Sequence, residues 1–321
     1  MSEYTSAIID VHQIDLCDKR FKISLSDTDI DALAHSIKTI GLICFPLLRP
    51  MGHNTFMIIC GFNRIQALIK NKISRIPAVI VPENTSELDC YKKAITALSF
   101  KQPLTHAQLI VCVNRLISFC DAKTIAQMAP SVFNLALNEK FIQDLLQISA
   151  LPDPCLKLVH TEQLAIKSAR RLADFDARTT AVFLDLFSKI KASSSKQFEI
   201  ITFMTETAAR DGISVDSLYH DPQFQTILSN PDLPLGIKTN EIRLFLYEKR
   251  YPSIFDARKK VLNHIHDLKL GPGIKLVPPE NFEGTDYQWS FTTKNLREFK
   301  GHLETFSRVI QDKSLAQILK P

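Results

Sequence analysis

The hydrophobic pattern of the first ninety residues alternates between short apolar runs and a longer segment with helical periodicity. Apolar side chains recur every three or four residues between positions 30 and 40, which predicts an amphipathic helix. Ser26 and Asp29 precede it at capping-box spacing, and Gly41 follows it where a left-handed cap favours glycine. Apolar runs bounded by turn-forming residues predict strands at 8–11, 45–49, 56–60 and 76–81.

A glycine marks the junction between the third predicted strand and a second predicted helix. Gly52-His53-Asn54 predicts a hairpin turn before this strand, and a helix opens at Gly61 and runs to about Asn71. Glycine lets the backbone turn tightly and lets a ligand approach it closely. The unpaired amides of the new helix suit an anion such as phosphate, and Arg64 can add a bidentate contact. A tight turn followed by a solvated arginine gives the same pattern.

The middle of the chain predicts short helices. Thr105 stands where an N-cap is expected, and apolar residues between 109 and 117 form a stripe after it. Segments 122–129 and 138–149 predict two further helices with a turn between them, and Pro152 ends the second. Two such helices suit a helix-turn-helix, although unrelated helical domains have the same pattern.

The second helix of this pair carries side chains suited to DNA contacts. Asn138 and Gln143 are of the types that read adenine edges in the major groove, and Lys140 can contact a phosphate. Glu139 and Asp144 on the same helix would repel the DNA backbone. The residues fit base-specific DNA binding and a purely structural helix equally well.

A second cationic cluster follows. Lys167, Arg170 and Arg171 fall within about one turn of a predicted helix, which makes them the better candidates for phosphate contacts. An ordinary solvated helix face has the same composition, so both interpretations stay open.

The C-terminal half predicts helices at 177–190, 197–210, 242–251 and 253–268, with a break at Pro252. Aromatic residues at helical spacing are usually packing residues. They predict the core of a helical bundle made of Phe183, Phe187, Phe198, Phe203, Phe245 and Phe255.

After Gly271-Pro272-Gly273 the hydrophobic pattern changes from helical periodicity to short apolar runs. The last fifty residues predict strands at 274–277 and 287–292 and an amphipathic helix at 295–310. A strand pair with one helix does not easily bury its apolar face alone, which favours docking or dimerisation. The predicted fold class is α+β, divided into a small α/β domain at 1–90, a helical domain at 91–176, a helical bundle at 177–270 and the strand pair with its helix at 271–321.

Composition narrows the functional classes. The chain is 45% hydrophobic and 23% charged, as ordinary globular proteins are, and its net charge of +5 permits a polyanionic partner without requiring one. The seven cysteines form no CxxC pair, which favours free thiols and a cytoplasmic location. No apolar run approaches the roughly 20 residues of a membrane span, and His264-x-His266 has no further ligands nearby, so neither a membrane nor a metal is expected.

Three motifs in the first domain agree in order and spacing with one known family. They are Ser36-Ile37-Lys38-Thr39-Ile40-Gly41-Leu42, the run Phe45-Pro46-Leu47-Leu48, and Gly61-x-x-Arg64-x-x-Ala67. Together, over residues 6–83, they resemble the N-terminal domain of the ParB and sulfiredoxin superfamily. In ParB proteins this domain binds CTP, and its arginine-containing box contacts the phosphates. The resemblance implies nucleotide binding by Gly61, Asn63, Arg64 and Ala67.

A weaker resemblance to ParB continues to about residue 175. It rests on Leu104–Gln108, Ile125-Ala126, Ile148–Pro152 and Gln163–Leu172. The stretch between Ala126 and Leu151 is longer than in the family, with an insertion expected around 130–137. The resemblance implies DNA binding by Lys140, Gln143, Lys167, Arg170 and Arg171.

Departures from the family pattern affect the expected chemistry. Phe62 replaces the acidic residue of the box, and Asn63 replaces its first arginine. A phenyl ring cannot attack, ligate magnesium or move a proton, so catalysis by this position is excluded. The family's ENxxR motif falls at 97–101, where only Lys101 keeps its charge. Metal-assisted hydrolysis is therefore not expected, and weak CTPase activity is the upper limit.

The leading hypothesis is a ParB-like DNA-binding protein, which acts in chromosome or plasmid partitioning or in nucleoid-associated regulation. It predicts CTP binding without magnesium-dependent turnover, a homodimer, a partner ATPase and a cytoplasmic, nucleoid-associated location. Two alternatives stay open. One is a nucleotide-dependent enzyme of the same fold, and the other is a non-catalytic adaptor that has lost nucleotide binding.

Overall fold

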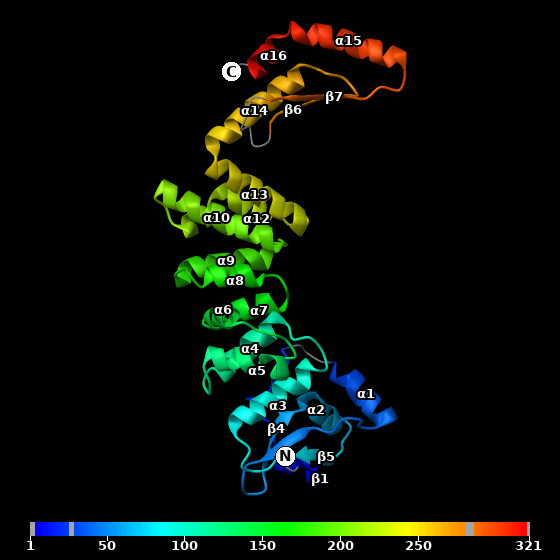
Figure 1. The fold of residues 1–321 in the computed structure, drawn as a ribbon, viewed down its shortest axis with the longest axis vertical. Helices are drawn as coiled ribbons and strands as arrows, with labels where there is room; N and C mark the ends of the chain where they lie inside the picture. The colour runs from blue at the N-terminus through cyan, green and yellow to red at the C-terminus, as the bar shows by residue number, and fades with distance from the viewer. Residues whose placement is uncertain (1–3, 26–28, 280–285, 320–321) are drawn as a thin grey trace. The chain divides into compact units, whose positions relative to one another are not determined.

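The computed structural model describes residues 4–25, 29–279 and 286–319. Its chain divides into two compact units, Met1–Phe198 and Glu199–Pro321. Figure 1 shows a sheet with its helices at the N-terminal end and helices through most of the remaining chain. The mixed α and β composition agrees with the predicted fold class.

A mixed sheet forms the centre of the first unit. β1 pairs antiparallel with β5, β3 pairs antiparallel with β4 and parallel with β5, and β2 runs parallel to β4. The strand order is β1-β5-β3-β4-β2. The four predicted strands are confirmed, although Val11 belongs to a short 3-10 turn and the two-residue β2 was not predicted. The strands are β1 Thr5–Asp10, β2 Ile14–Asp15, β3 Leu47–Pro50, β4 Phe56–Cys60 and β5 Arg75–Ile80.

Both predicted helices of this domain are present, as α1 Ile30–Ile40 and α2 Phe62–Lys70. The carboxylate of Asp29 caps α1 by accepting hydrogen bonds from the amides of Asp31 and Ala32. Ser26 of the expected capping box lies outside the described residues. Gly41 ends α1 with a φ of +95°, as its position predicts.

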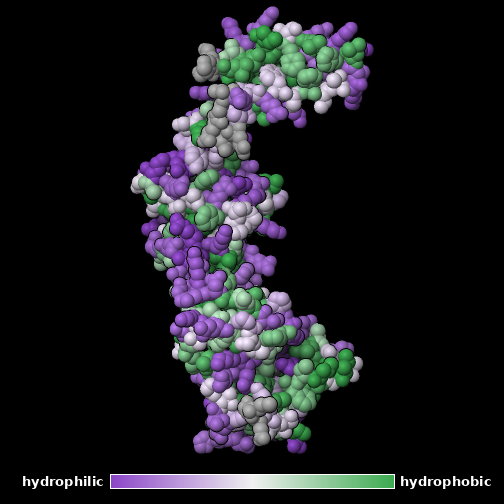
Figure 2. Space-filling model, in the orientation of Figure 1, coloured by the Kyte–Doolittle hydropathy of each residue, from purple (hydrophilic) through white to green (hydrophobic). Residues whose placement is uncertain are grey.

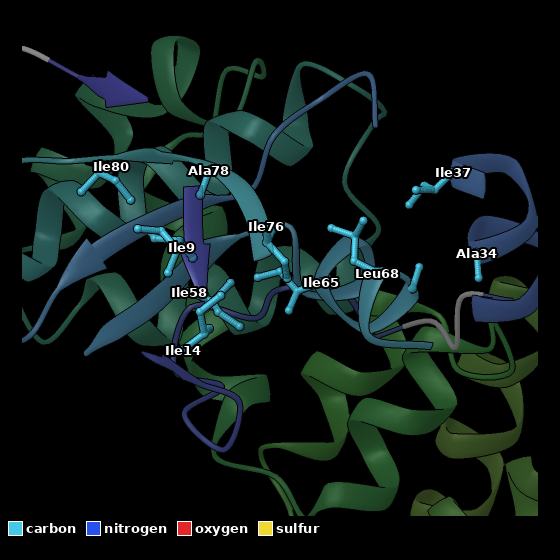
Figure 3. Close-up of a cluster of buried hydrophobic side chains, with 12 residues drawn as sticks. Ile9, Ile14, Ala34, Ile37, Ile58, Ile65, Leu68, Ile76, Ala78 and Ile80 are labelled. Carbon is cyan, nitrogen blue, oxygen red and sulfur yellow. The ribbon is translucent and has the colours of Figure 1, made fainter. Parts of the chain in front are cut away.

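The hydrophobic core lies between these two helices and one face of the sheet (Figure 3). Successive residues of a strand point to opposite faces, so the buried members of the core come from alternate strand positions. Figure 3 shows Ile58, Ile76 and Ile9 from the sheet converging with Ile65 of α2, while Ala34 and Ile37 of α1 approach from the other helix.

A third helix, α3 Glu87–Ser99, packs on the opposite face of β4. Met57 and Ile59, which alternate with Ile58, are 2% and 0% exposed. The hydrophobic pattern did not predict α3, and the predicted domain boundary at residue 90 falls inside this helix. The hydroxyl of Ser86 accepts from the amide of Asp89 at the start of α3, and this cap was a usable signal.

The rest of the first unit is helical. Thr105 and Gln108 form the capping box of α4, and Asn138 caps α6. α5 continues through Pro130 to Val132, three residues beyond its predicted end at Ala129. The short α7 was not predicted. These helices are α4 His106–Leu116, α5 Ala122–Val132, α6 Glu139–Ser149, α7 Asp153–His160, α8 Ile166–Leu172 and α9 Ala177–Lys189.

The second unit contains more helices than the sequence pattern predicts. α13 begins at Leu235 rather than at Ile242, and α11, α12 and α16 were not predicted. Both predicted C-terminal strands are present and pair antiparallel. The elements from Ser194 onward are α10 Ser194–Asp211, α11 Val215–Tyr219, α12 Pro222–Ser229, α13 Leu235–Arg250, α14 Pro252–Asp267, β6 Ile274–Val277, β7 Gln288–Phe291, α15 Leu296–Ile310 and α16 Lys313–Ile318.

The predicted aromatic bundle core is only partly correct. Phe183 and Phe187 are buried in the first unit, and Phe245 is buried in the second, so they do not share one core. Phe198 is 47% exposed and does not act as a core residue.

Arg243 and Arg250 of α13 bind Glu199 and Glu206 of α10 at 2.7 and 2.8 Å, which links these two helices by repeated ion pairs. Among the described residues, no helix has the length and apolarity of a membrane span.

Candidate functional site

The turn between β4 and α2 has a geometry that only glycine fits. Gly61 is the N-cap of α2, with φ +99° and ψ 20°, in the left-handed region. A Cβ atom on Gly61 would lie 2.9 Å from both the Cα and the Cβ of Pro46. Backbone conformation and close approach to β3 therefore both require glycine, and the first turn of α2 begins with its amides unobstructed by a cap side chain.

Arg64 holds the chain segment that leads into β3. Its Nη1 donates hydrogen bonds to the carbonyls of Cys44 at 2.8 Å and Phe45 at 3.1 Å. Burial raises the pKa of the Cys60 thiol, and the Arg64 guanidinium opposes that rise, so the two side chains are close. Arg64 therefore has an internal role that the spacing of the sequence did not indicate.

A small cavity lies beside the first turn of α2. It measures about 80 Å³ and is lined by Leu16, Lys19, Lys22, Ile58, Phe62 and Gln66. A bound water needs roughly 10–15 Å³ of such space, so the cavity is of phosphate size and too small for a whole nucleotide, since ligand pockets are usually ~300 Å³ or more.

Lys19 and Lys22 supply the positive charge of this cavity, and sequence reasoning missed them. They come from the irregular segment after β2, which lies far from the Gly61 turn in the sequence. The run Asp18-Lys19-Arg20-Phe21-Lys22 was a usable signal, because it places three cations in five residues. Arg20 is paired with Asp18 at 2.9 Å and does not line the cavity, whereas Lys19 and Lys22 do.

The other residues expected to contact a nucleotide have different environments. Asn63 is half-buried in the first turn of α2, whereas Ala67 is 0% exposed and packs in the core. Phe62 lines the small cavity and also packs against the core. Ala97 and Lys101, at the end of α3, are exposed. Within the described residues, no group of three or more His, Cys, Asp or Glu side chains is placed to hold a metal ion.

The DNA-binding candidates on α6 face solvent. Lys140 and Gln143 are exposed, and the amide of Gln143 donates to Glu139 at 3.5 Å. Lys167, at the start of α8, is also exposed. These three side chains remain accessible to a polyanion.

Arg170 and Arg171 are engaged within the protein. Arg170 donates to Asp144 of α6 at 3.1 Å and to Asp174 at 2.7 Å. Arg171 lies 3.5 Å from Asp174 and places its guanidinium over the ring of Phe175. The hydrogen bond from Arg170 lowers the pKa of the Asp174 carboxyl. Arg170 therefore ties α6 to α8 and neutralises Asp144, the carboxylate that would otherwise repel a DNA backbone.

The family assignment agrees with this geometry. Residues 2–93 match the model of the ParB N-terminal domain. Residues 2–93 therefore contain a ParB N-terminal domain. No curated protein matches the chain.

Solved structures of ParB proteins also align with the chain. C-terminally truncated ParB from Caulobacter crescentus complexed with CTP-gamma-S is 16% identical, with 57% of this chain and 99% of that chain covered and a TM-score of 0.28. The same protein complexed to the centromeric parS site is 14% identical, with coverages of 60% and 96% and a TM-score of 0.38. The pNOB8-like ParB N-domain is 14% identical, with coverages of 82% and 98% and a TM-score of 0.38. Likeness at this level transfers neither a ligand nor a partner.

The Gly61 turn can be tested against a second left-handed glycine. Gly61→Ala should destabilise the fold by about 2 kcal/mol or more, because about 1–2 kcal/mol of backbone strain adds to the clash with Pro46. Gly52→Ala is the matched control, since Gly52 has φ +78° with open space around its missing Cβ, and it should lose only the backbone contribution. Urea unfolding followed by circular dichroism measures both. Equal losses would show that the contact with Pro46 contributes nothing.

Proposed function

We propose that this chain is a ParB-like DNA-binding protein that acts in chromosome or plasmid partitioning or in nucleoid-associated regulation. Its N-terminal domain binds CTP with little hydrolysis. The observation that carries the proposal is the ParB N-terminal domain at 2–93 together with the Gly61 turn, which begins α2 beside a phosphate-sized cavity lined by Lys19 and Lys22.

The proposed nucleotide site uses charge and backbone rather than a metal. The N-terminus of α2 favours an anion through its helix dipole, and Lys19 and Lys22 add positive charge at the same cavity. The cavity holds one phosphate group, and the sugar and base lie outside it. Phe62 stands where a carboxylate would be needed for proton transfer or metal binding, which supports binding without efficient turnover.

Calorimetry with CTP tests the nucleotide proposal. The wild-type chain should bind CTP, and Lys22→Ala should weaken binding about tenfold or more, because a charge-assisted contact contributes about 1.5–3 kcal/mol. Arg64→Ala should also weaken binding, since it releases the carbonyls of Cys44 and Phe45 that brace the turn. Lys38→Ala, an exposed lysine on α1, is the control and should bind normally.

Two outcomes would contradict this account. No heat from CTP with the wild-type chain would remove the nucleotide from the proposal. Brisk phosphate release from CTP would instead contradict the role given to Phe62, and it would favour a nucleotide-dependent enzyme of the same fold.

The proposed DNA interface consists of the exposed cations of α6 and α8. Lys140 and Lys167 are exposed and can contact phosphates, and the exposed Gln143 can approach base edges when its side chain leaves Glu139. Arg170 holds the two helices together, and Arg171 is partly shielded by Asp174 and Phe175. Phosphate contact by Arg171 requires it to leave Asp174, whereas Lys140 and Lys167 need no such rearrangement.

DNA binding should depend on salt in a way that identifies these lysines. Each phosphate contact contributes about −0.9 to the slope of log affinity against log salt concentration. Lys140→Ala and Lys167→Ala should each reduce the magnitude of the slope by about that amount, with Lys38→Ala unchanged. Fluorescence anisotropy with duplex DNA at several salt concentrations gives the slopes. If neither substitution changes the slope, the DNA interface lies elsewhere on the chain.

An adaptor that has lost nucleotide binding is the second candidate. It is favoured by the internal engagement of Arg64, whose Nη1 is already bound to two backbone carbonyls. Calorimetry distinguishes the adaptor from the leading proposal. An adaptor should not bind CTP, while its DNA affinity should keep the same dependence on salt concentration.

We also propose that the chain is a homodimer joined through α15, and that a partner ATPase acts on the dimer. Leu296, Phe299, Leu303 and Ile310 are 70%, 37%, 51% and 73% exposed. Their spacing is that of the a and d positions of a heptad, the pattern of self-associating helices. Figure 2 shows apolar side chains gathered at the C-terminal end of the chain, where Phe291 of β7 contacts Phe299.

Light scattering coupled to size exclusion tests the dimer. Leu303→Lys should convert the dimer to a monomer, because it places a charge in the centre of the apolar stripe. Glu304→Lys changes an exposed residue beside that stripe and should leave the dimer intact. A wild-type chain that is monomeric at every concentration would contradict the assignment.

A further inference from the structure

Helix α3 covers only one half of the sheet face on which it packs. The residues that alternate with the core positions of each strand point toward this face. On β4 these residues are Met57 and Ile59, and both are buried beneath α3. The β4 half of this face is therefore complete.

The β1 and β5 half of the same face is open. Ile8 is 62% exposed, and Tyr4, just before β1, is 51% exposed. The register places Ile8 beside Pro77, and Val79 beside both Ser6 and Leu47. Pro77, Val79 and Leu47 are only half-buried, so an apolar strip crosses β1, β5 and β3 without a covering element among the described residues.

The open strip has the dimensions of a helix. A cavity of about 500 Å³ lies over it, lined by Tyr4, Leu47, Val79 and the α3 residues Lys92, Lys93, Thr96 and Ala97. Three adjacent strands span about 10 Å at a spacing of ~4.8 Å, and an α-helix with its side chains is about 10–12 Å wide. One further helix laid beside α3 would complete this layer.

The charge around the groove is positive. Among the described residues that line it there is no carboxylate, and Lys93 extends over the ring of Tyr4 at 5.7 Å. Arg49, on the same face of β3 as Leu47, has a buried Nε without a hydrogen-bond partner in the described structure. Arg49 does not line the groove, since its register beside Met57 places it toward β4, so Lys92 and Lys93 are the cations at the groove.

We propose that this groove binds an acidic amphipathic helix of a partner protein. The apolar side of that helix covers Ile8, Val79 and Leu47, and its carboxylates reach Lys93. This is helix-in-groove recognition, with burial giving affinity and charge giving selectivity. The groove is separate from the phosphate-sized cavity at Gly61, because the two have no lining residue in common.

A labelled synthetic helix tests the proposal on the full chain. The probe is a fluorescent amphipathic peptide with leucine on one face and glutamate on its flanks, followed by anisotropy. Ile8→Lys should weaken its binding about tenfold or more, as loss of a buried aliphatic contact predicts. Lys93→Glu should weaken it about two- to fivefold, as expected for an exposed ion pair. The same peptide with lysine in place of glutamate should prefer the Lys93→Glu variant.

Matched variants separate this groove from the rest of the surface. Ile43→Lys introduces the same change at a residue that is 82% exposed in the loop after α1, and peptide binding should be unaffected. Absence of binding to the wild-type chain, or binding that Ile8→Lys leaves intact, would overturn the proposal. Self-association that Ile8→Lys abolishes would overturn it too, because the occupant would then be a second copy of the chain. CTP binding by Ile8→Lys should equal that of the wild type, so a failure here is distinguishable from a failure of the nucleotide site.

Discussion

The close approach of Gly61 to Pro46 is the contact on which the organisation of the first domain depends. It fixes where β4 ends and α2 begins, and it holds the start of α2 against Pro46, the residue just before β3. Arg64 reinforces this arrangement one turn later by binding the carbonyls of Cys44 and Phe45. A single chain reversal thereby sets the orientation of the helix dipole and the position of the cavity beside it. Lys19 and Lys22, in the segment after β2, add positive charge beside this cavity.

Internal pairing separates the cations of this chain into two groups. Arg64 and Arg170 are used to hold elements together, the first by carbonyl contacts and the second by two carboxylates. Lys19, Lys22, Lys140 and Lys167 face a cavity or solvent instead. Arginine suits the first task because its planar group makes several fixed hydrogen bonds, whereas a lysine retains a mobile point charge. The two proposed anion-binding surfaces are therefore lysine surfaces.

Much of the fold could be predicted from local signals. The capped helix at 30–40, the hairpin and the glycine turn all depend on residues close in sequence, and all are present. What the pattern missed depends on contacts distant in sequence. The role of Lys22 follows from packing of its loop against α2, and Phe198 was predicted as core because periodicity does not show which face of a helix a neighbour covers. Short helices such as α11 and α12 span too few turns for periodicity to identify.

Nucleotide binding as proposed requires that the first turn of α2 receives a phosphate group, and backbone amide chemical shifts measure this directly. In a nitrogen-labelled chain titrated with CTP, the account predicts saturable shifts at the amides of Phe62, Asn63 and Arg64, while the amides of α9 stay unchanged. Saturable binding that shifts other amides and leaves these three in place would contradict it.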